Sequence, residues 1–352
     1  MRRRLSLLSL LALAAAGPAA AQPAPEARAH YGTGRAATTL LVRGTTDVEL
    51  FAPLFQAFAD ANPEIAVAYE QWGSNALADA VAASCRAAAP AADLVVSSSV
   101  DQLVRLVNDG CAQPHRSAAV SALPPAKNWR DELVGVTEEP AVIVYNRERV
   151  PAADVPRSRF DLIDLLRPAD SAYVGRVATY DIEVSGLGYL FAFTDSQQAT
   201  TFGSLIEAFA HSRSVATCCS TEIIDAVAEG RYLIAYNVLG SYAFARAAAD
   251  RRLGVVPPED YTLVLSRAAM IPKTAPNPVA AGFLVDFMLS EPGRAALAAE
   301  YLLLAPPNAL GPSPADDALF RPIPLSPTLL VGLDRQKRAA FLARWRATFA
   351  SP

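Results

Sequence analysis

The segment TTLLVRGTTDVELFAPLFQAF, residues 38–58, decides the fold class of this chain. It opens with a short apolar run that ends at Gly44 and predicts a β-strand. A polar loop of Thr45, Thr46 and Asp47 follows. After the loop, apolar side chains recur at three- and four-residue steps, which predicts an amphipathic helix. These apolar residues are Leu50, Phe51, Leu54, Phe55 and Phe58.

The same unit repeats along the chain. IAVAYEQW (65–72) and DLVVSSS (93–99) predict further strands, and each is followed by a helical pattern. Strands that alternate with helices predict a parallel sheet with right-handed crossovers. RVATY (176–180) and YLIAY (232–236) resume the pattern, and 352 residues are enough for two lobes. We therefore expect an α/β protein of two lobes, each a mainly parallel sheet flanked by helices.

The last helical pattern, DRQKRAAFLARWRATF (334–349), carries Phe341, Leu342 and Trp345 on one face. Aromatic residues on a periodic face are usually buried. We therefore expect Trp345 to anchor a core and not to form a ligand platform.

The composition excludes several classes of protein. Apolar residues make up 52% of the chain, which excludes a disordered protein, and the net charge is -4. No Lys/Arg cluster beyond the first four residues offers a footprint for a phosphate backbone, so nucleic acid is not an expected partner. Three histidines and four cysteines form no zinc-binding pattern, and no metal or cofactor is expected.

The N-terminus has the pattern of a secretory signal peptide. Residues 1–21 comprise three arginines, an apolar run and a small-residue stop, with cleavage expected after Ala21. Residues 22–37 are rich in Ala, Pro and Gly and are expected to form a flexible leader. No later stretch approaches about 18 uninterrupted apolar residues, so we expect a soluble periplasmic protein without a membrane span.

In an open α/β sheet, ligands bind beyond the carboxyl ends of the strands. The loops there carry small, hydroxyl or amide side chains, which also serve as ordinary helix caps. Several converging helix N-termini would favour an anionic group. The absence of Lys and Arg from these loops argues against a highly charged ligand. The predicted ligand-binding residues are Thr45, Thr46, Asp47, Ser98, Ser99, Ser185, Gly186, Gly188, Thr221, Asn237, Ser241 and Tyr242.

An enzymatic function has less support. The chain lacks the G-x-S-x-G and phosphate-loop motifs. Carboxylates near the crevice could act as acid and base in a secreted hydrolase, but solvated loop positions are commoner for such residues. These carboxylates are Asp47, Glu138, Glu139, Asp181 and Glu183. We expect a binding protein.

The four cysteines divide into two pairs. Cys85 and Cys111 fall at the same predicted end of the sheet, and export permits oxidation, so a disulfide is expected; two buried thiols are the alternative. Adjacent cysteines bond each other only with difficulty, so Cys218 and Cys219 are expected to stay unbonded as small filler residues. Small residues near the ligand and a soft metal site are the alternatives.

Several stretches in fixed order resemble the periplasmic solute-binding proteins of ABC transporters, in the type 2 group of ferric-iron and phosphoglycerate-type components. The stretches include residues 40–69, PAVIVYN (140–146), TYDIEVSGLGY (179–189) and EGRYLIAYNVLGSYAFAR (229–246). The resemblance implies a two-lobed fold that closes on a ligand. It places residues 38–141 plus 257–352 in lobe 1 and residues 142–256 in lobe 2.

The resemblance also implies partners. A monomeric binding protein would deliver its solute to a membrane permease or present it to a membrane sensor kinase. Iron binders of the family have adjacent tyrosines where this chain has only Tyr242. A small anionic solute is therefore the first expectation. A ferric or other metal complex held by Tyr242 is the alternative.

Overall fold

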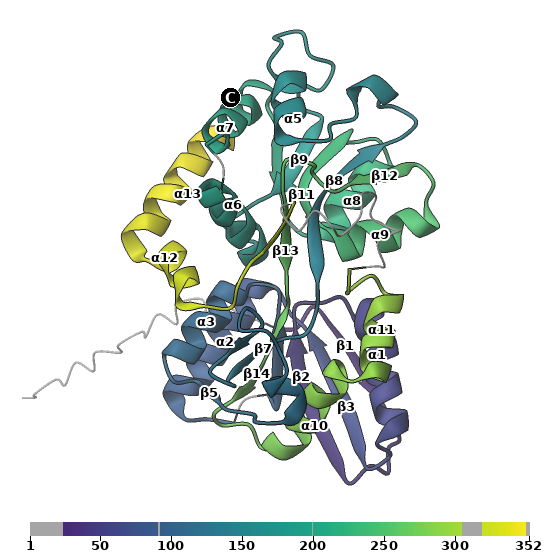
Figure 1. Cartoon of the computed structure of the whole chain (residues 1–352), viewed down its shortest axis with the longest axis vertical. Coiled ribbons are helices and arrows are strands. Elements are labelled where there is room, and N and C mark those ends of the chain that lie inside the picture. The colour runs from purple at the N-terminus through teal and green to yellow at the C-terminus, as the bar shows by residue number, and fades with distance from the viewer. Residues whose placement is uncertain (1–23, 91, 199, 305–318, 350–352) are drawn as a thin grey trace, which may run out of the picture.

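The computed structural model describes residues 24–90, 92–198, 200–304 and 319–349. The signal peptide expected at residues 1–21 and its cleavage site lie outside the described residues. Two β-sheets, each covered by helices, form an upper and a lower lobe (Figure 1). In the described ranges, no helix combines the length and the apolar character needed to cross a membrane.

The first lobe is built on a mixed sheet with the strand order β1-β3-β2-β4-β14-β7-β6, and β5 pairs with β14. Its strands are β1 (Ala27–Tyr31), β2 (Thr38–Gly44), β3 (Ile65–Gln71), β4 (Leu94–Ser97), β5 (Ala112–Gln113), β6 (Asn128–Trp129), β7 (Leu133–Gly135) and β14 (Ala268–Pro272). Its helices are α1 (Val48–Ala61), α2 (Ser74–Ala87), α3 (Val100–Asn108), α4 (Ala118–Ser121), α10 (Pro278–Leu289) and α11 (Glu291–Ala299).

The second lobe has the strand order β10-β9-β11-β8-β13-β15, and β12 pairs with β8. Its strands are β8 (Glu139–Asn146), β9 (Val177–Tyr180), β10 (Val215–Thr217), β11 (Ile234–Leu239), β12 (Leu253–Val256), β13 (Thr262–Leu265) and β15 (Phe320–Pro322). Its longer helices are α5 (Arg159–Leu166), α6 (Gly186–Gln198), α7 (Phe202–His211), α8 (Ser220–Ala228), α9 (Gly240–Ala249) and α13 (Arg335–Phe349), and α12 (Leu330–Leu333) precedes α13.

The predicted two-lobed α/β architecture is confirmed, but the sheets are mixed and not mainly parallel. β2 runs parallel to β3 and β4, as the strand–helix alternation predicts. Successive strands change sheet three times along the chain, from β7 to β8, from β13 to β14 and from β14 to β15. Because β8 lies antiparallel to β11, β12 and β13, and β14 lies antiparallel to β4 and β7, the first two of these crossings introduce antiparallel pairs into both sheets.

Part of the leader expected to be flexible is a strand. β1 pairs antiparallel with β3 along all five of its residues, from Ala27 to Tyr31. Its side chains alternate in exposure: Arg28 and His30 face solvent, and Tyr31 is buried beside Phe55. This two-residue alternation is a strand signal that the Ala-, Pro- and Gly-rich composition of residues 22–37 concealed.

The C-terminal third does not lie wholly with the first sheet, where residues 257–352 were expected. β13 and β15 belong to the second sheet, and α13 lies beside α6 and α7 (Figure 1). The ring of Phe341 makes edge contacts with Tyr189 and Phe193 of α6, at centroid distances of 5.7 and 5.6 Å. Trp345 is buried in the core of the second lobe, as predicted. Apolar burial therefore attaches this segment to the second lobe.

Two disulfides are present in the described residues. One joins Cys85 and Cys111, the pair for which a bridge was expected, with 5.4 Å between their Cα atoms. The other joins the adjacent Cys218 and Cys219, so the expectation of unbonded filler residues is wrong. The backbone adapts at this point, because Cys219 takes a positive φ of 36° where the chain turns into α8.

Candidate ligand-binding site

Three of the predicted residues join the two lobes directly. The Tyr242 hydroxyl, on α9 of the second lobe, accepts a hydrogen bond from the Asp47 amide (3.1 Å) and donates to Asp47 Oδ1 (3.2 Å). The Thr221 hydroxyl, on α8, donates to Asp47 Oδ2 (2.9 Å). Asp47 precedes α1 of the first lobe, so one carboxylate binds the start of two helices from the opposite lobe.

A second contact between the lobes involves residues that the sequence interpretation missed. The Gly186 amide, at the start of α6, donates to Ser74 Oγ at 2.9 Å. The Asn75 side chain donates to the carbonyl oxygens of Glu183 (3.1 Å) and Val184 (3.0 Å). Ser74 and Asn75 begin α2 after β3, and this strand end was left out of the predicted crevice although the same rule covers it.

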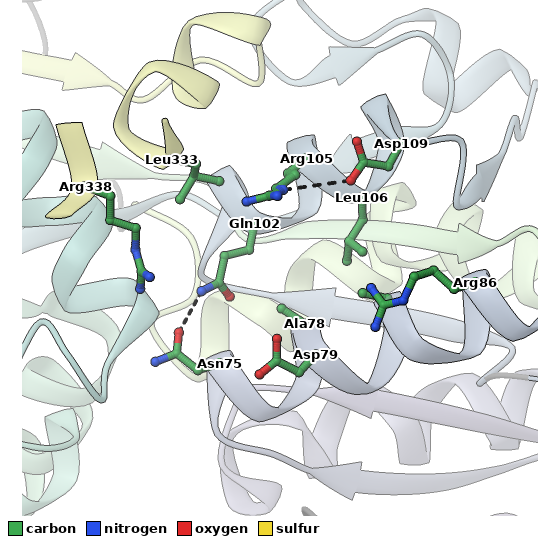
Figure 2. Close-up of a pocket in the computed structure, with 11 residues that line it drawn as sticks. Asn75, Ala78, Asp79, Arg86, Gln102, Arg105, Leu106, Asp109, Leu333 and Arg338 are labelled. Atoms are coloured by element: carbon green, nitrogen blue, oxygen red, sulfur yellow. Dashed lines mark hydrogen bonds and ion pairs between the residues drawn. The ribbon is translucent and has the colours of Figure 1, made fainter. Parts of the chain in front are cut away.

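The Asn75 contact borders a cavity. Gln102 of α3 donates to Asn75 Oδ1 at 2.7 Å, and Figure 2 shows this bond at one side of the cavity. The cavity, with a volume of about 430 Å³, lies between α2, α3 and the C-terminal segment, with Arg86 and Arg338 in its wall. The edge of the interlobe contact is therefore open to small molecules.

The hydroxyl loops of the first lobe meet beside Gly186. Thr45 Oγ1 lies 3.1 Å from Ser98 Oγ and accepts a hydrogen bond from the Ser98 amide (3.0 Å). The Ser99 hydroxyl is fully buried and has no hydrogen-bond partner among the described residues. A Cβ atom on Gly186 would lie 2.6 Å from Ser99 Oγ, so this hydroxyl faces the opposite lobe at close range.

A buried ion pair lies where the chain crosses between the sheets. Arg267, between β13 and β14, donates from Nε to Glu139 Oε1 (2.8 Å) and from Nη2 to Oε2 (3.2 Å). Both side chains are almost completely buried. Burial by itself lowers the pKa of Arg267, but the carboxylate of Glu139 raises that pKa above its ordinary value. The guanidinium is therefore charged, and its charge is balanced within the site.

Two predicted ligand residues are bound to this ion pair. Arg267 Nη1 donates to Thr46 Oγ1 at 2.9 Å, and the Ser241 hydroxyl donates to Glu139 Oε2 at 2.5 Å. Thr46 comes from the first lobe and Ser241 from the second, and both are fully buried. These hydroxyls therefore connect the site to the crossing strands. The sequence did not point to Arg267, because it lies in the short connection between β13 and β14 and not in one of the loops that carry small hydroxyl or amide side chains before a helix.

Tyr242 is a neutral hydrogen-bonding group in this setting. Burial raises its pKa above the ordinary value; the nearby Arg267 lowers it and the Asp47 carboxylate raises it further. The guanidinium of Arg267 lies 5.7 Å from the centroid of the Tyr242 ring. The phenol therefore keeps its proton at neutral pH and uses it in the bond to Asp47.

Three predicted residues have local structural roles. Ser185 accepts a hydrogen bond from the Gly188 amide (3.0 Å) in the first turn of α6, as a helix cap does. A Cβ atom on Gly188 would lie 2.4 Å from Tyr180 Cβ, so this glycine allows the helix to approach β9 closely. Asn237 lies in β11 with a φ of 62°, at the point where the pairing with β8 shifts register.

The carboxylates considered for catalysis lie in different settings. Glu139 pairs with Arg267, Glu138 with Lys127, and Glu183 with Arg346. Asp181 accepts a hydrogen bond from the Glu183 amide. Within the part of the chain that the structure describes, no three His, Cys, Asp or Glu side chains gather as a metal site would require.

Asp101, in the first turn of α3 beside Ser99, is a buried carboxyl. Burial raises its pKa to about 7, against the lowering effects of the backbone amides of Gln102 and Asp101 and of the Arg338 charge. The folded protein therefore keeps a proton that the unfolded chain releases near pH 4. The free energy of unfolding should decrease as the pH rises from about 4 to about 7, and stay level above that.

We expect Asp101→Asn to flatten this dependence, since the amide does not titrate. Between pH 5 and pH 8, two pH units fall within the window, and over them the free energy of unfolding of the parent should decrease by up to about 3 kcal/mol from this group. The variant should lack this decrease. Urea unfolding at both pH values measures the difference. Asp109→Asn, at the exposed end of the same helix, should keep the parent's slope. An equally steep slope in Asp101→Asn would contradict the assignment.

Comparison with known proteins shows what the chain is similar to. Residues 89–324 match the profile of the family described as bacterial extracellular solute-binding protein. The substrate-binding protein of an ABC transporter from Agrobacterium tumefaciens is 34% identical, with 93% of this chain and 99% of that chain covered and a TM-score of 0.85. A search of curated proteins finds no match.

More distant structures share the fold. Iron-bound HitA from Pseudomonas aeruginosa is 19% identical, with 88% of this chain and 99% of that chain covered and a TM-score of 0.65. The periplasmic binding protein AfuA from Actinobacillus pleuropneumoniae, with fructose-6-phosphate bound, is 17% identical, with 90% and 99% covered and a TM-score of 0.67.

Proposed function

The chain belongs to the bacterial extracellular solute-binding protein family, and from this premise we propose that it captures a small anionic solute between its lobes and passes it to an ABC transporter permease. Its fold is the two-lobed type 2 periplasmic binding protein fold that the sequence predicted. Capture occurs by closure of the two lobes, and no bond in the solute is made or broken.

The observation that carries the proposal is the position of Asp47. Its carboxylate binds the Tyr242 and Thr221 hydroxyls of the opposite lobe, and its backbone amide binds Tyr242 as well. A residue with bonds to both lobes changes its partners when the lobes separate. This position supports a site whose geometry depends on closure.

The solute class follows from the groups that face the interlobe contact. The helices α3, α6 and α8 all begin there, and a helix N-terminus offers free amides and the positive end of its dipole. The buried Ser99 hydroxyl is an unused hydrogen-bonding group at the same place. An anionic group of modest charge fits these donors, because the Arg267 charge is already balanced by Glu139.

Iron is the second candidate, since HitA was solved with iron and has the same fold. Here a metal would have to displace the proton of Tyr242, whose pKa is raised by burial. AfuA, which resembles this chain about as closely as HitA does, was solved with a sugar phosphate. The neutral Tyr242 favours the anionic solute over the metal.

The remaining features of the proposal concern location and partners. A signal peptide of residues 1–21, cleaved after Ala21, exports the chain to the periplasm. The mature protein acts there as a monomer. Its partner is a permease, or a membrane sensor kinase to which the closed form is presented.

The proposal is tested by native mass spectrometry of the protein purified from its own periplasm, which gives the mass of a retained solute. Fructose 6-phosphate, inorganic phosphate and ferric iron are then added singly. A solute at 100 times its dissociation constant stabilises the folded form by about 2.7 kcal/mol, which raises the melting temperature measurably. Retention of ferric iron with a visible colour would select the second candidate instead.

Ser99→Ala tests the site itself. Because the Ser99 hydroxyl has no partner among the residues that the structure describes, its removal should leave the melting temperature of the solute-free protein unchanged. It should raise the dissociation constant of the retained solute by about tenfold, the effect of one lost hydrogen bond of about 1.4 kcal/mol. Isothermal titration measures the change.

Ser98→Ala is the matched control, because the Ser98 hydroxyl is bonded to Thr45. It should lower the stability of the solute-free protein by about 1 kcal/mol. Unchanged affinity in Ser99→Ala would remove Ser99 from the site. Absence of any retained or stabilising solute would contradict the function.

A further inference from the structure

The Cys218–Cys219 disulfide lies next to the interlobe contact. It occupies the turn between β10 and α8, and Cys219 is the residue that precedes the helix. Two residues further on, Thr221 makes the hydrogen bond to Asp47 of the opposite lobe. No role in the proposed capture of solute accounts for a disulfide at this point.

The two disulfides differ in their access to a reductant. Exchange begins when a thiolate attacks one sulfur of the disulfide, so it requires an accessible sulfur atom. Cys219 is exposed and Cys218 is half-buried, whereas Cys111 is only 5% exposed and its partner Cys85 is half-buried. A reductant in solution therefore reaches Cys219 first.

Chain connectivity favours the same order. Cys85 and Cys111 are 26 residues apart, so their bond closes a long loop of the unfolded chain and stabilises the fold. Cys218 and Cys219 are neighbours, and their bond closes no such loop. Reduction at Cys218–Cys219 therefore leaves the rest of the fold intact.

The conformation of Cys219 connects this disulfide to the start of α8. Cys219 has a positive φ of 36°, a backbone region that residues other than glycine rarely occupy. The hydroxyl of the following residue, Ser220, lies 2.6 Å from the Tyr180 hydroxyl. The Tyr180 hydroxyl in turn accepts a hydrogen bond from the Leu239 amide. Without its link to Cys218, Cys219 can return to an ordinary φ, and Ser220 and Thr221 move with it.

We propose that Cys218–Cys219 is a thiol–disulfide exchange site, at which a dithiol reductant opens the disulfide and weakens the interlobe bond of Thr221 with Asp47. One thiolate of the dithiol attacks Cys219 Sγ, and Cys218 leaves as a thiolate that takes up a proton. The second thiol of the dithiol then attacks the mixed disulfide and releases the Cys219 thiol. Two electrons and two protons pass to the cysteines, and the dithiol becomes a disulfide.

Weakening the bond between Thr221 and Asp47 favours the open arrangement of the lobes. The consequence for solute capture rests on the proposed function. The oxidised protein then holds solute more tightly than the reduced one. The redox state of this one pair, and not that of Cys85–Cys111, sets the difference.

The first test measures selectivity. The folded protein with both disulfides is treated with increasing concentrations of dithiothreitol, its free thiols are blocked with iodoacetamide, and the labelled peptides are identified by mass spectrometry. We expect Cys218 and Cys219 to be labelled at concentrations that leave Cys85 and Cys111 unlabelled. Simultaneous labelling of all four cysteines, or earlier labelling of Cys85 and Cys111, would overturn the proposal.

The second test measures the effect on α8. Amide hydrogen exchange at residues 220–223 should become about tenfold faster after selective reduction, the change expected when a hydrogen bond of ordinary net strength is lost. Cys218→Ser/Cys219→Ser should show the same increase without a reductant. Thr221→Val should show it with the disulfide intact. Unchanged exchange in the reduced protein would reject the link to the interlobe contact.

Neither measurement needs a solute, so both can be interpreted even if the solute-binding proposal fails. If solute capture is established but its affinity is the same in the oxidised and reduced proteins, the redox inference alone is rejected.

Discussion

Replacing Arg267 with methionine is expected to lower the free energy of unfolding by about 3 to 5 kcal/mol, the range found when one partner of a buried ion pair is removed. The substitution leaves the Glu139 carboxylate buried, with the hydroxyls of Thr137 and Ser241 as its remaining side-chain donors among the described residues. It also removes the donor to Thr46. Urea unfolding followed by circular dichroism measures the loss.

Two further variants separate the charge from simple loss of packing. Arg157→Met breaks an exposed pair with Glu259 and should cost about 0 to 1 kcal/mol. Combining Arg267→Met with Glu139→Leu removes both charges, so the double variant should be more stable than Arg267→Met alone. Equal losses for Arg267→Met and Arg157→Met would show that the buried pair is not important to stability.

The second large effect is expected on solute affinity, from Gly186→Val. A Cβ atom there would lie 2.6 Å from Ser99 Oγ, 2.8 Å from Gln102 Nε2 and 3.0 Å from Ser74 Oγ. All three neighbours belong to the first lobe, so these three clashes arise when the lobes are together. Overpacking costs typically about 1 to 3 kcal/mol, and the added isopropyl group at this position should weaken binding on the order of a hundredfold.

The same variant should leave the stability of the separated lobes unchanged. Isothermal titration with the retained solute measures the affinity, and small-angle X-ray scattering should report the larger radius of an open molecule. Gly34→Val is the matched control, since apart from its chain neighbours no atom of the described residues lies within 4 Å of a Cβ at Gly34, and it should bind as the parent does. Unimpaired binding by Gly186→Val would mean that the lobes do not close at this contact to hold solute.

The sequence could predict the elements around the site because their signals are local. The apolar period of residues 48–58 depends only on which side of one helix is buried, and α1 buries Leu50, Phe51, Leu54, Phe55 and Phe58 as expected. The hydroxyl loops at strand ends follow from sheet geometry in the same way. Ser99 and Gly186, named for this reason, do meet at the contact between the lobes.

The residues that were missed are defined by partners far along the chain. Glu139 was placed near the crevice, but its partner Arg267 lies 128 positions away in no periodic pattern that marks it as buried. Ser74 and Asn75 become interlobe donors only because α6 begins opposite them. The disulfide of Cys218 and Cys219 depends on a positive φ at Cys219, which no side-chain pattern indicates.

By itself, then, the sequence determined the α/β class, the two-lobed plan and the hydroxyl character of the loops, because each depends on residues close together in the chain. Only the tertiary structure decided where the C-terminal helix packs, which carboxylate balances Arg267, and that Asp47 meets Tyr242 across 195 positions. The physical reason lies in the repeated crossings between the sheets. They bring distant segments together, and burial then requires each polar group to find whatever partner lies opposite.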